Sequence, residues 1–551
     1  MNSENNPSTS ASPGATLPRV GWTLLIVVTL FVCYFTHLGA LGFVGPDEPR
    51  YAWIARDMAE SGDWITPRLY GQPWFEKPVL YYWGAAASFK LFGVSEAAAR
   101  LPSAISALLA TLALAGLAWR LYGAETARWL LLLLPATIGM IGFSHAASTD
   151  MPFSAMLTVT MVCAAEVIGL TRAENSSTIP RTPWLALALL GFFLGLAVLA
   201  KGPAAIILSG GAIFFWALFA KRWRDAFRCL HPLAIVTFCL TALPWYVVCS
   251  RRNPEFFHVF IVEHNFRRFF TPEFQHVQPF WYYAPVLLVG ILPWTALFLW
   301  ALANGISRLR HARNISDSAC FLICWAAFCV AFFSISRSKL PGYILPAIPA
   351  VSLLLAHART QVTSPWQEKF GRLTLPIIGA SLVIPVLFLA LAPHFPNRRF
   401  FMAAGILLAL IGMSNLLVAA FHSSNQGGFR RFAAASCVLP ILLAVVMLNH
   451  VLPVVFRSDP SGRSLATELQ SSGIPAHNLR VAGMNRGLNY SLNFYMREEI
   501  KTWDKDHPVE GYLLTATAAN CRYWVLQPFE CQPVPFPNTG GRFLYKVLPA
   551  R

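Results

Sequence analysis

Apolar runs close to the roughly 20 residues that a membrane-spanning helix needs recur from near the start of this 551-residue chain almost to its end. The mean hydropathy is +0.51, and 13% of the residues are charged. A soluble domain carries about 25% charged residues, so the composition excludes an ordinary soluble enzyme. The runs predict an all-α polytopic membrane protein.

Thirteen runs are long enough to be counted as transmembrane helices. A further run, 79–93, is short and carries Lys90, so we interpret it as an amphipathic segment that lies in the membrane interface. The predicted spans are 20–43, 101–119, 129–144, 151–171, 184–200, 203–220, 232–250, 279–303, 317–335, 342–356, 373–393, 400–421 and 432–456.

The connections between these spans differ in kind on the two sides of the membrane. One set is short and rich in Arg, and the positive-inside rule makes it cytoplasmic, together with an N-terminal tail over 1–19. The other set contains the long segments 44–100 and 251–278 and nearly every unusual polar motif. Because the span count is odd, the transmembrane domain over 20–456 is followed on this second side by the tail 457–551.

This tail is predicted to be a small soluble α/β domain. The stretches RVAGMN, YWVLQP and RFLYKVL alternate as strands do, and SGRSLATELQSS has a helical pattern. Cys521 and Cys531 lie within it, and a disulfide is plausible if the tail is outside the cytosol. The other nine cysteines lie in or beside apolar runs and are interpreted as small buried hydrophobic residues.

The net charge of +17 follows from basic residues scattered between the spans. No single soluble face gathers them, which argues against nucleic acid and for anionic membrane lipids. Several cations nevertheless lie on the side that the positive-inside rule disfavours. They indicate a site for phosphate-bearing ligands, although salt bridges to local carboxylates would also explain them.

The stretch GPDEPRYA places two adjacent carboxylates, Asp47 and Glu48, directly after the first span. Pro49 suits the first turn of a helix, which we expect to run to about Glu60. A helix cap would account for one carboxylate but not for two. The motif is therefore a candidate for chemistry.

Several motifs in order resemble one family. GPDEPRYA, DWITPRLYGQPWFEKPVLYYW, TDMP, AKGP and SRSKLPGYILP are similar to the lipid A aminoarabinose (4-amino-4-deoxy-L-arabinose) transferases, a branch of the GT-C glycosyltransferases related to protein O-mannosyltransferases. The resemblance covers roughly residues 20–350 strongly and the rest by layout.

The resemblance implies a GT-C fold with its active site at the periplasmic face of the bacterial inner membrane. The donor would be undecaprenyl-phosphate-aminoarabinose and the acceptor a phosphate of lipid A, which would confer resistance to polymyxin and cationic peptides. Asp47 and Asp150 match the acidic positions of the family and are the predicted catalytic residues. We expect a monomer.

The chemistry also constrains the residues. Glycosyl transfer passes through an oxocarbenium-like state, and a departing lipid phosphate needs cations. The acceptor phosphate is already ionised, so Asp47 is expected to orient a substrate or stabilise the anomeric charge, and a general-base role stays open. The absence of an obvious nucleophile favours a single inverting displacement. The predicted substrate-binding residues are Glu48, Arg50, Tyr51, Lys77, Tyr81, Tyr82, Lys201, Arg267, Arg268, Lys339 and Tyr343.

Three further assignments stay open. Glu76 could bind a divalent ion, Zn or Mg, with His258 and His264, but six-residue spacing is not that of a zinc helix. The histidines could instead be hydrogen-bonded at the interface. Asp150 could be only a helix N-cap, and Glu166, an acid within a span, has no assigned role.

Two other functions remain as alternatives. Another GT-C enzyme, such as a protein O-mannosyltransferase, would use a hydroxyl acceptor. A lipid transporter would place its ionisable residues near the bilayer midplane, often with repeat symmetry, whereas here they gather at one interface and no halves repeat.

Overall fold

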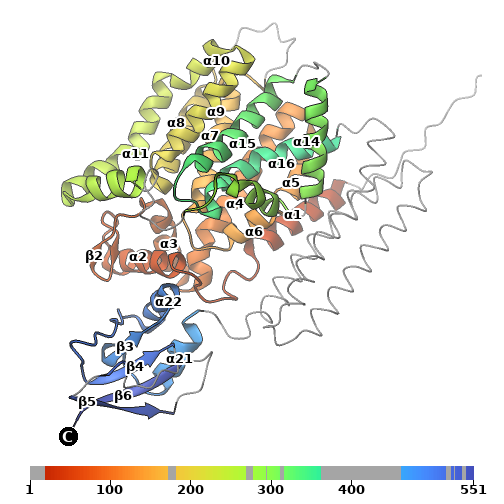
Figure 1. The fold of residues 1–551 in the computed structure, drawn as a ribbon. Helices are drawn as coiled ribbons and strands as arrows, with labels where there is room; N and C mark the ends of the chain where they lie inside the picture. Colours follow the sequence, from red (N-terminus) through yellow and green to blue (C-terminus); the bar gives the residue numbers. More distant parts are fainter. Residues whose placement is uncertain are drawn as a thin grey trace, which may run out of the picture.

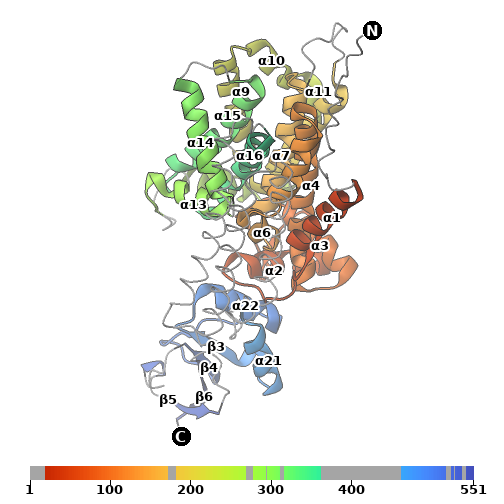
Figure 2. The same cartoon turned by 90° about the vertical axis from the view of Figure 1, so that its right-hand side faces the viewer.

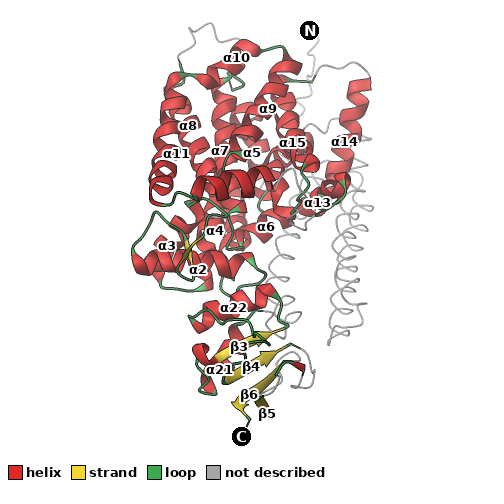
Figure 3. Ribbon diagram, turned by 60° about the vertical axis from the view of Figure 1, so that its left-hand side comes forward, coloured by secondary structure: helices red, strands yellow, loops and turns green. Residues whose placement is uncertain are grey.

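The structure, a computed structural model, is mostly helical, with long helices at one end and a small sheet at the other (Figures 1 and 3). Three predicted spans, 373–393, 400–421 and 432–456, lie outside the residues that it describes. The described residues are 19–171, 182–267, 277–292, 294–310, 315–360, 461–516, 523–525, 528–535 and 542–550.

Six described helical segments are long and apolar enough to cross a membrane, and one bent pair would make seven. The count of thirteen is therefore not decided by the described part of the chain. The six are α4 (Glu96–Tyr122), α7 (Asp150–Val167), α8 (Trp184–Lys201), α11 (Pro232–Arg252), α15 (Asp317–Ile335) and η4 with α16 (Pro341–Ala347 and Ile348–Thr360). Shorter or less apolar helices are α1 (Arg19–Phe35), α9 (Ala204–Ala220), α10 (Trp223–Phe227), α13 (Tyr283–Gly290) and α14 (Thr295–Arg310).

The predicted span 129–144 is not one straight helix. It is broken into α5 (Ala124–Leu133) and α6 (Ile138–Ser144), which are bent by 61°. Pro135 lies in the break and has no N–H to donate. The hydroxyl of Thr137 accepts the backbone N–H of Met140 at 3.3 Å and so begins the second helix.

Glu166, which had no assigned role, lies near the end of α7. Its carboxylate pairs with Arg120 near the end of α4 at 2.5 Å and accepts the Thr171 hydroxyl at 2.6 Å. Arg120 is largely exposed, and α4 and α7 both end here, at the face opposite the acidic motifs. Glu166 therefore links the ends of these two helices.

Two glycines let α8 approach α11 closely. A Cβ atom built on Gly191 would lie 2.0 Å from the carbonyl oxygen of Ala234, and one on Gly195 would lie 2.7 Å from Thr241 Cβ. Small residues four apart allow such backbone contact between membrane helices.

Gly191→Ala is therefore expected to destabilise the protein by about 1–3 kcal/mol, the usual cost of overpacking. The measurement is the free energy of unfolding in mixed detergent micelles. Gly210→Ala on α9 is the matched control, because a Cβ there meets nothing within 4 Å. Equal stability of the two variants would show that this helix contact is not close.

A layer of short elements lies between the long helices and the C-terminal sheet (Figures 1 and 2). It consists of α2 (Asp47–Ser61), α3 (Leu80–Phe92) and the two-stranded ribbon of β1 (Arg68–Leu69) and β2 (Gln72–Pro73). The helix predicted from Asp47 to about Glu60 is confirmed, and it ends at Gly62, which has the left-handed φ of 76°.

The C-terminal part contains a four-stranded sheet of order β3-β4-β6-β5, in which only the β3–β4 pair is parallel. The predicted helix and the strands at RVAGMN and RFLYKVL are present. YWVLQP was a wrong strand prediction, because Tyr523 and Trp524 lie in a turn and β5 begins only after Pro528. The elements are α21 (Arg463–Ser471), η6 (Ala476–Asn478), β3 (Leu479–Ala482), α22 (Arg486–Met496), β4 (Gly511–Thr515), β5 (Phe529–Val534) and β6 (Phe543–Pro549).

Candidate active site

Four charged residues form what we call the acidic knot: Asp47, Arg50, Glu76 and Lys77. Arg50 donates to the Asp47 carboxylate, to Glu76 Oε2 at 2.9 Å and to the Pro46 carbonyl at 2.8 Å. Lys77 Nζ lies 3.4 Å from Glu76 Oε1. The Arg50 side chain is 5% exposed, whereas that of Asp47 is 48% exposed. Arg50 is therefore buried and holds the Asp47 carboxylate in place, whereas the Asp47 side chain is accessible to solvent.

Four tyrosines were predicted to bind substrate, and two of them, Tyr51 and Tyr82, border the knot. Burial, and then the Glu76 carboxylate, raises the pKa of Tyr51 and of Tyr82 well above the ordinary value. Both therefore remain neutral phenols at physiological pH. The Tyr82 hydroxyl is buried and has no hydrogen-bond partner in the described part of the chain. The Tyr81 hydroxyl, in contrast, has a partner, since it donates to the Ala99 carbonyl at 2.9 Å.

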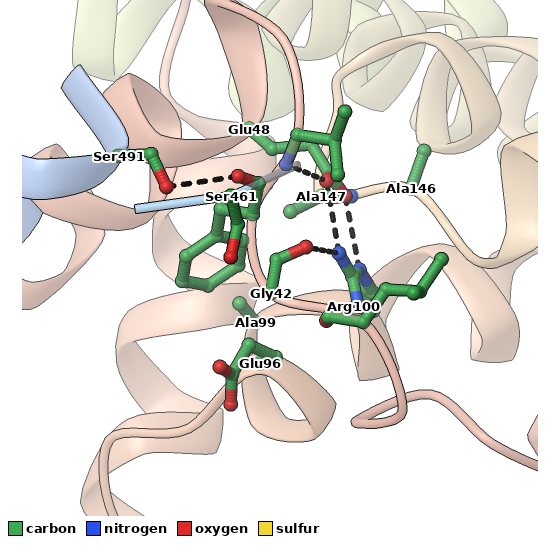
Figure 4. Close-up of polar contacts among 12 residues, drawn as sticks. Gly42, Glu48, Glu96, Ala99, Arg100, Ala146, Ala147, Ser461 and Ser491 are labelled. Carbon is green, nitrogen blue, oxygen red and sulfur yellow. Dashed lines mark hydrogen bonds and ion pairs between the residues drawn. The ribbon is translucent and has the colours of Figure 1, made fainter. Parts of the chain in front are cut away.

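Glu48 is held by Arg100, a residue whose partner the sequence did not reveal (Figure 4). Two guanidinium nitrogens each donate to one carboxylate oxygen at 2.9 Å. Arg100 also donates to the carbonyls of Leu38 and Leu41 at 2.7 Å and of Gly42 at 3.0 Å. The side chains of this bidentate pair are 5% and 14% exposed, so the pair holds the chain at the start of α2.

The same carboxylate joins two loops. Glu48 accepts the backbone N–H of Val44 at 3.0 Å and that of Ala147 at 2.8 Å. Ala147 lies three residues before Asp150, in the loop that leads into α7. The two adjacent acids of the motif therefore differ in role: Glu48 ties the loops together and Asp47 remains accessible.

Asp150 forms the second cluster with Lys201 and Tyr343. The Lys201 ammonium pairs with the Asp150 carboxylate and lies 4.5 Å from the centre of the Tyr343 ring. Asp150 is the first residue of α7, whose N-cap residue is Thr149, so the N-cap interpretation is wrong. Lys201 is the last residue of α8. The two charges come from opposite ends of neighbouring helices.

A glycine on η4 leaves room for this pair. A Cβ atom on Gly342 would lie 2.9 Å from the Asp150 carboxylate carbon and 2.8 Å from the ring of Phe143. Gly342→Ala is expected to displace Asp150 and to lower turnover roughly 10- to 100-fold, as misplacement of a reacting group does. Steady-state kinetics test this, with Gly142→Ala, where a Cβ meets nothing within 4 Å, as control. Full activity of Gly342→Ala would show that Asp150 need not hold this position.

Lys339 is buried and its ammonium is held by backbone carbonyls. Its ammonium donates to the carbonyls of Ser336 at 2.5 Å and Gln278 at 3.1 Å. Burial, and then the nearby Arg337, lowers its pKa. These hydrogen bonds brace the loop between α15 and η4. Arg267 lies at the end of a π-helix (His258–Arg267) and is exposed, and Arg268 lies outside the described residues.

The predicted metal site is not assembled. Glu76 is engaged by Arg50 and Lys77, and the exposed His258 lies 3.5 Å from Glu263. Within the described ranges no group of three His, Cys, Asp or Glu side chains could hold a metal ion. The grouping of Glu76 with His258 and His264 is therefore a wrong prediction, because two cations already neutralise this carboxylate.

Comparison with known proteins gives consistent matches. Residues 20–260 match the family profile described as dolichyl-phosphate-mannose-protein mannosyltransferase. The chain is 32% identical over 530 residues to an undecaprenyl phosphate-alpha-4-amino-4-deoxy-L-arabinose arabinosyl transferase of Enterobacter sp. (strain 638), covering 89% of this chain and 92% of the relative. A protein of the same name from Pseudomonas aeruginosa (strain UCBPP-PA14) is 33% identical, with 79% and 77% covered.

A solved structure also resembles this one over nearly its whole length. The crystal structure of ArnT from Cupriavidus metallidurans bound to undecaprenyl phosphate superimposes with a TM-score of 0.76 at 24% identity. The superposition covers 96% of this chain and 98% of that one. The two proteins share a fold.

Proposed function

The chain belongs to the undecaprenyl phosphate-4-amino-4-deoxy-L-arabinose arabinosyl transferase family, and we propose that it transfers this sugar to a phosphate of lipid A at the periplasmic face of the inner membrane. It is a multi-pass membrane glycosyltransferase that takes the sugar from undecaprenyl phosphate. The observation that carries this function is the match over 92% of the length of a relative so named.

The reaction that we propose is a single displacement. An oxygen of the acceptor phosphate attacks the anomeric carbon, and the bond from that carbon to the undecaprenyl phosphate oxygen breaks with its electron pair. Because the acceptor is already ionised, no proton has to be removed at this step. The configuration at the anomeric carbon is inverted.

The acidic knot supplies the charges that this reaction needs. Asp47, half-exposed and fixed by Arg50, is proposed to stabilise the positive charge that develops on the sugar and to orient its amino group. The 3.4 Å contact of Lys77 with Glu76 is longer than a strong charge-assisted hydrogen bond of about 2.8 Å. We propose that the Lys77 ammonium contacts the departing lipid phosphate.

Asp150 and Lys201 are proposed to support the same reaction from the second cluster. The link from Glu48 to the Ala147 amide, at 2.8 Å, couples the loop before Asp150 to the first turn of the Asp47 helix. The Lys201 charge beside Tyr343 would contact a substrate phosphate after release from Asp150. We also propose that Arg267 and Arg268 bind substrate and that the protein is a monomer.

Two observations support the periplasmic placement. The short connections at the opposite face are rich in Arg, and the positive-inside rule favours a cytosolic location for such connections. Cys531 of the C-terminal domain is disulfide-bonded, and such bonds persist in oxidising compartments, although Cys521 lies outside the described residues.

The function is tested by the mass spectrum of lipid A from a host lacking its own transferase. Expression of this chain is expected to add aminoarabinose to lipid A and to raise polymyxin resistance. Unmodified lipid A together with newly mannosylated protein would instead favour the second candidate, suggested by the match to the mannosyltransferase profile over residues 20–260.

A further inference from the structure

The C-terminal domain holds the loop that precedes the acidic knot. Tyr495 of α22 accepts the backbone N–H of Phe43 at 3.0 Å and donates to Glu96 at 2.7 Å. The Ser491 hydroxyl donates to the Phe43 carbonyl at 2.9 Å (Figure 4). Both backbone polar groups of one loop residue are thus satisfied by a helix more than 400 positions later in the chain.

Backbone also meets backbone at this contact. A Cβ atom on Gly487, in the first turn of α22, would lie 2.8 Å from the carbonyl carbon of Gly45. Gly45 itself has a left-handed φ of 72° and lies two residues before Asp47. Movement of α22 is therefore transmitted directly to the segment that begins the Asp47 helix.

The same helix covers the buried cation of the knot. The Arg50 guanidinium lies 5.4 Å from the centre of the Tyr490 ring. Arg50 holds the Asp47 and Glu76 carboxylates, so the ring closes the side of the knot that faces the C-terminal domain. A guanidinium over an aromatic ring is stabilised, and more strongly where water is excluded.

We propose that helix α22 is a positioning element for transfer: docked on residues 42–45 and on Arg50, it fixes the direction of the Asp47 carboxylate. Tyr490, Tyr495 and Gly487 are accordingly positioning residues, which act through Arg50 and the loop and do not touch the reacting atoms. The predicted effect of α22 on turnover rests on the proposed function. The predicted effect of α22 on the loop at residues 42–45 does not depend on any substrate.

The test uses the full-length protein purified in detergent, with two readouts. Gly487→Ala, Tyr495→Phe and Tyr490→Ala are expected to lower kcat roughly tenfold with little change in the KM for the donor, as misplacement of a reacting group does. Tyr490→Phe keeps the ring and should restore turnover. Tyr523→Phe, on an exposed tyrosine of the same domain, is the matched control.

The second readout is amide hydrogen exchange of residues 39–50. Tyr495→Phe should speed exchange at Phe43, whose N–H loses its acceptor, while the Tyr523→Phe control should not. Faster exchange in Tyr495→Phe than in a wild type that itself transfers no sugar would support the positioning contact and reject the proposed function. Normal turnover and unchanged exchange in Tyr495→Phe and Gly487→Ala would overturn the inference even if transfer itself is confirmed.

Discussion

Replacing Asp47 with asparagine should lower the rate of aminoarabinose transfer by about 100- to 1,000-fold, the usual effect of removing one group that stabilises charge in a transition state. The amide keeps the shape of the side chain and can still accept a hydrogen bond from Arg50, but it carries no negative charge toward the sugar. The KM for the donor should change much less than kcat.

The measurement is steady-state transfer by the purified variant. Asp57→Asn is the matched control, because Asp57 is an acid on the same helix that makes none of the contacts of the knot. An Asp47→Asn protein that folds normally and turns over at the wild-type rate would remove Asp47 from the mechanism and leave the knot with a structural role only.

Arg100→Ala should be the most destabilising single change considered for this site. It leaves the Glu48 carboxylate buried without its cation and removes the donor for three backbone carbonyls. Breaking a buried ion pair from one side costs about 3–5 kcal/mol. The free energy of unfolding of Arg100→Lys should lie between those of the wild type and Arg100→Ala. An ammonium has three donors and cannot bind a carboxylate and three carbonyls together.

The free energy of unfolding in mixed micelles checks this prediction. Arg120→Ala on the same helix is the control, since Arg120 is 57% exposed in its pair with Glu166 and an exposed pair contributes about 1 kcal/mol or less. If the two arginine variants were equally stable, the junction at Glu48 would not hold the loops as described.

Local patterns were sufficient for much of the fold. Periodicity and hydropathy located the long helices, and Pro49 after two acids located the start of α2. The break at Pro135 was missed because a 16-residue apolar run was counted as one span without weighing its proline. The predicted spans after residue 360 lie outside the described part of the chain.

The site shows why the remaining assignments needed coordinates. The sequence indicated Lys77 and Lys201 by residue type, and Asp47 and Asp150 by their resemblance to a family. The pairing of these charges depends on contacts between distant segments. Glu48 and Arg100 are 52 positions apart, and nothing local marks one as the partner of the other. The only available signal was the second carboxylate itself, which a helix cap did not explain.

The C-terminal domain illustrates the same limit more strongly. Its helix and two of its strands followed from alternation and from a helical pattern. That Tyr490 would cover Arg50, and that Gly487 would meet Gly45, follows only from docking of two surfaces with no periodic signature.

The central claim, that this chain moves aminoarabinose from undecaprenyl phosphate to lipid A through Asp47, is tested most directly by reconstitution. Purified protein is incubated with undecaprenyl-phosphate-aminoarabinose and lipid A, and the lipid A is analysed by mass spectrometry. The account predicts lipid A that carries the sugar with the wild type, and almost none over the same time with Asp47→Asn. Unmodified lipid A with correctly folded wild-type protein, or equal modification by both proteins, would contradict it.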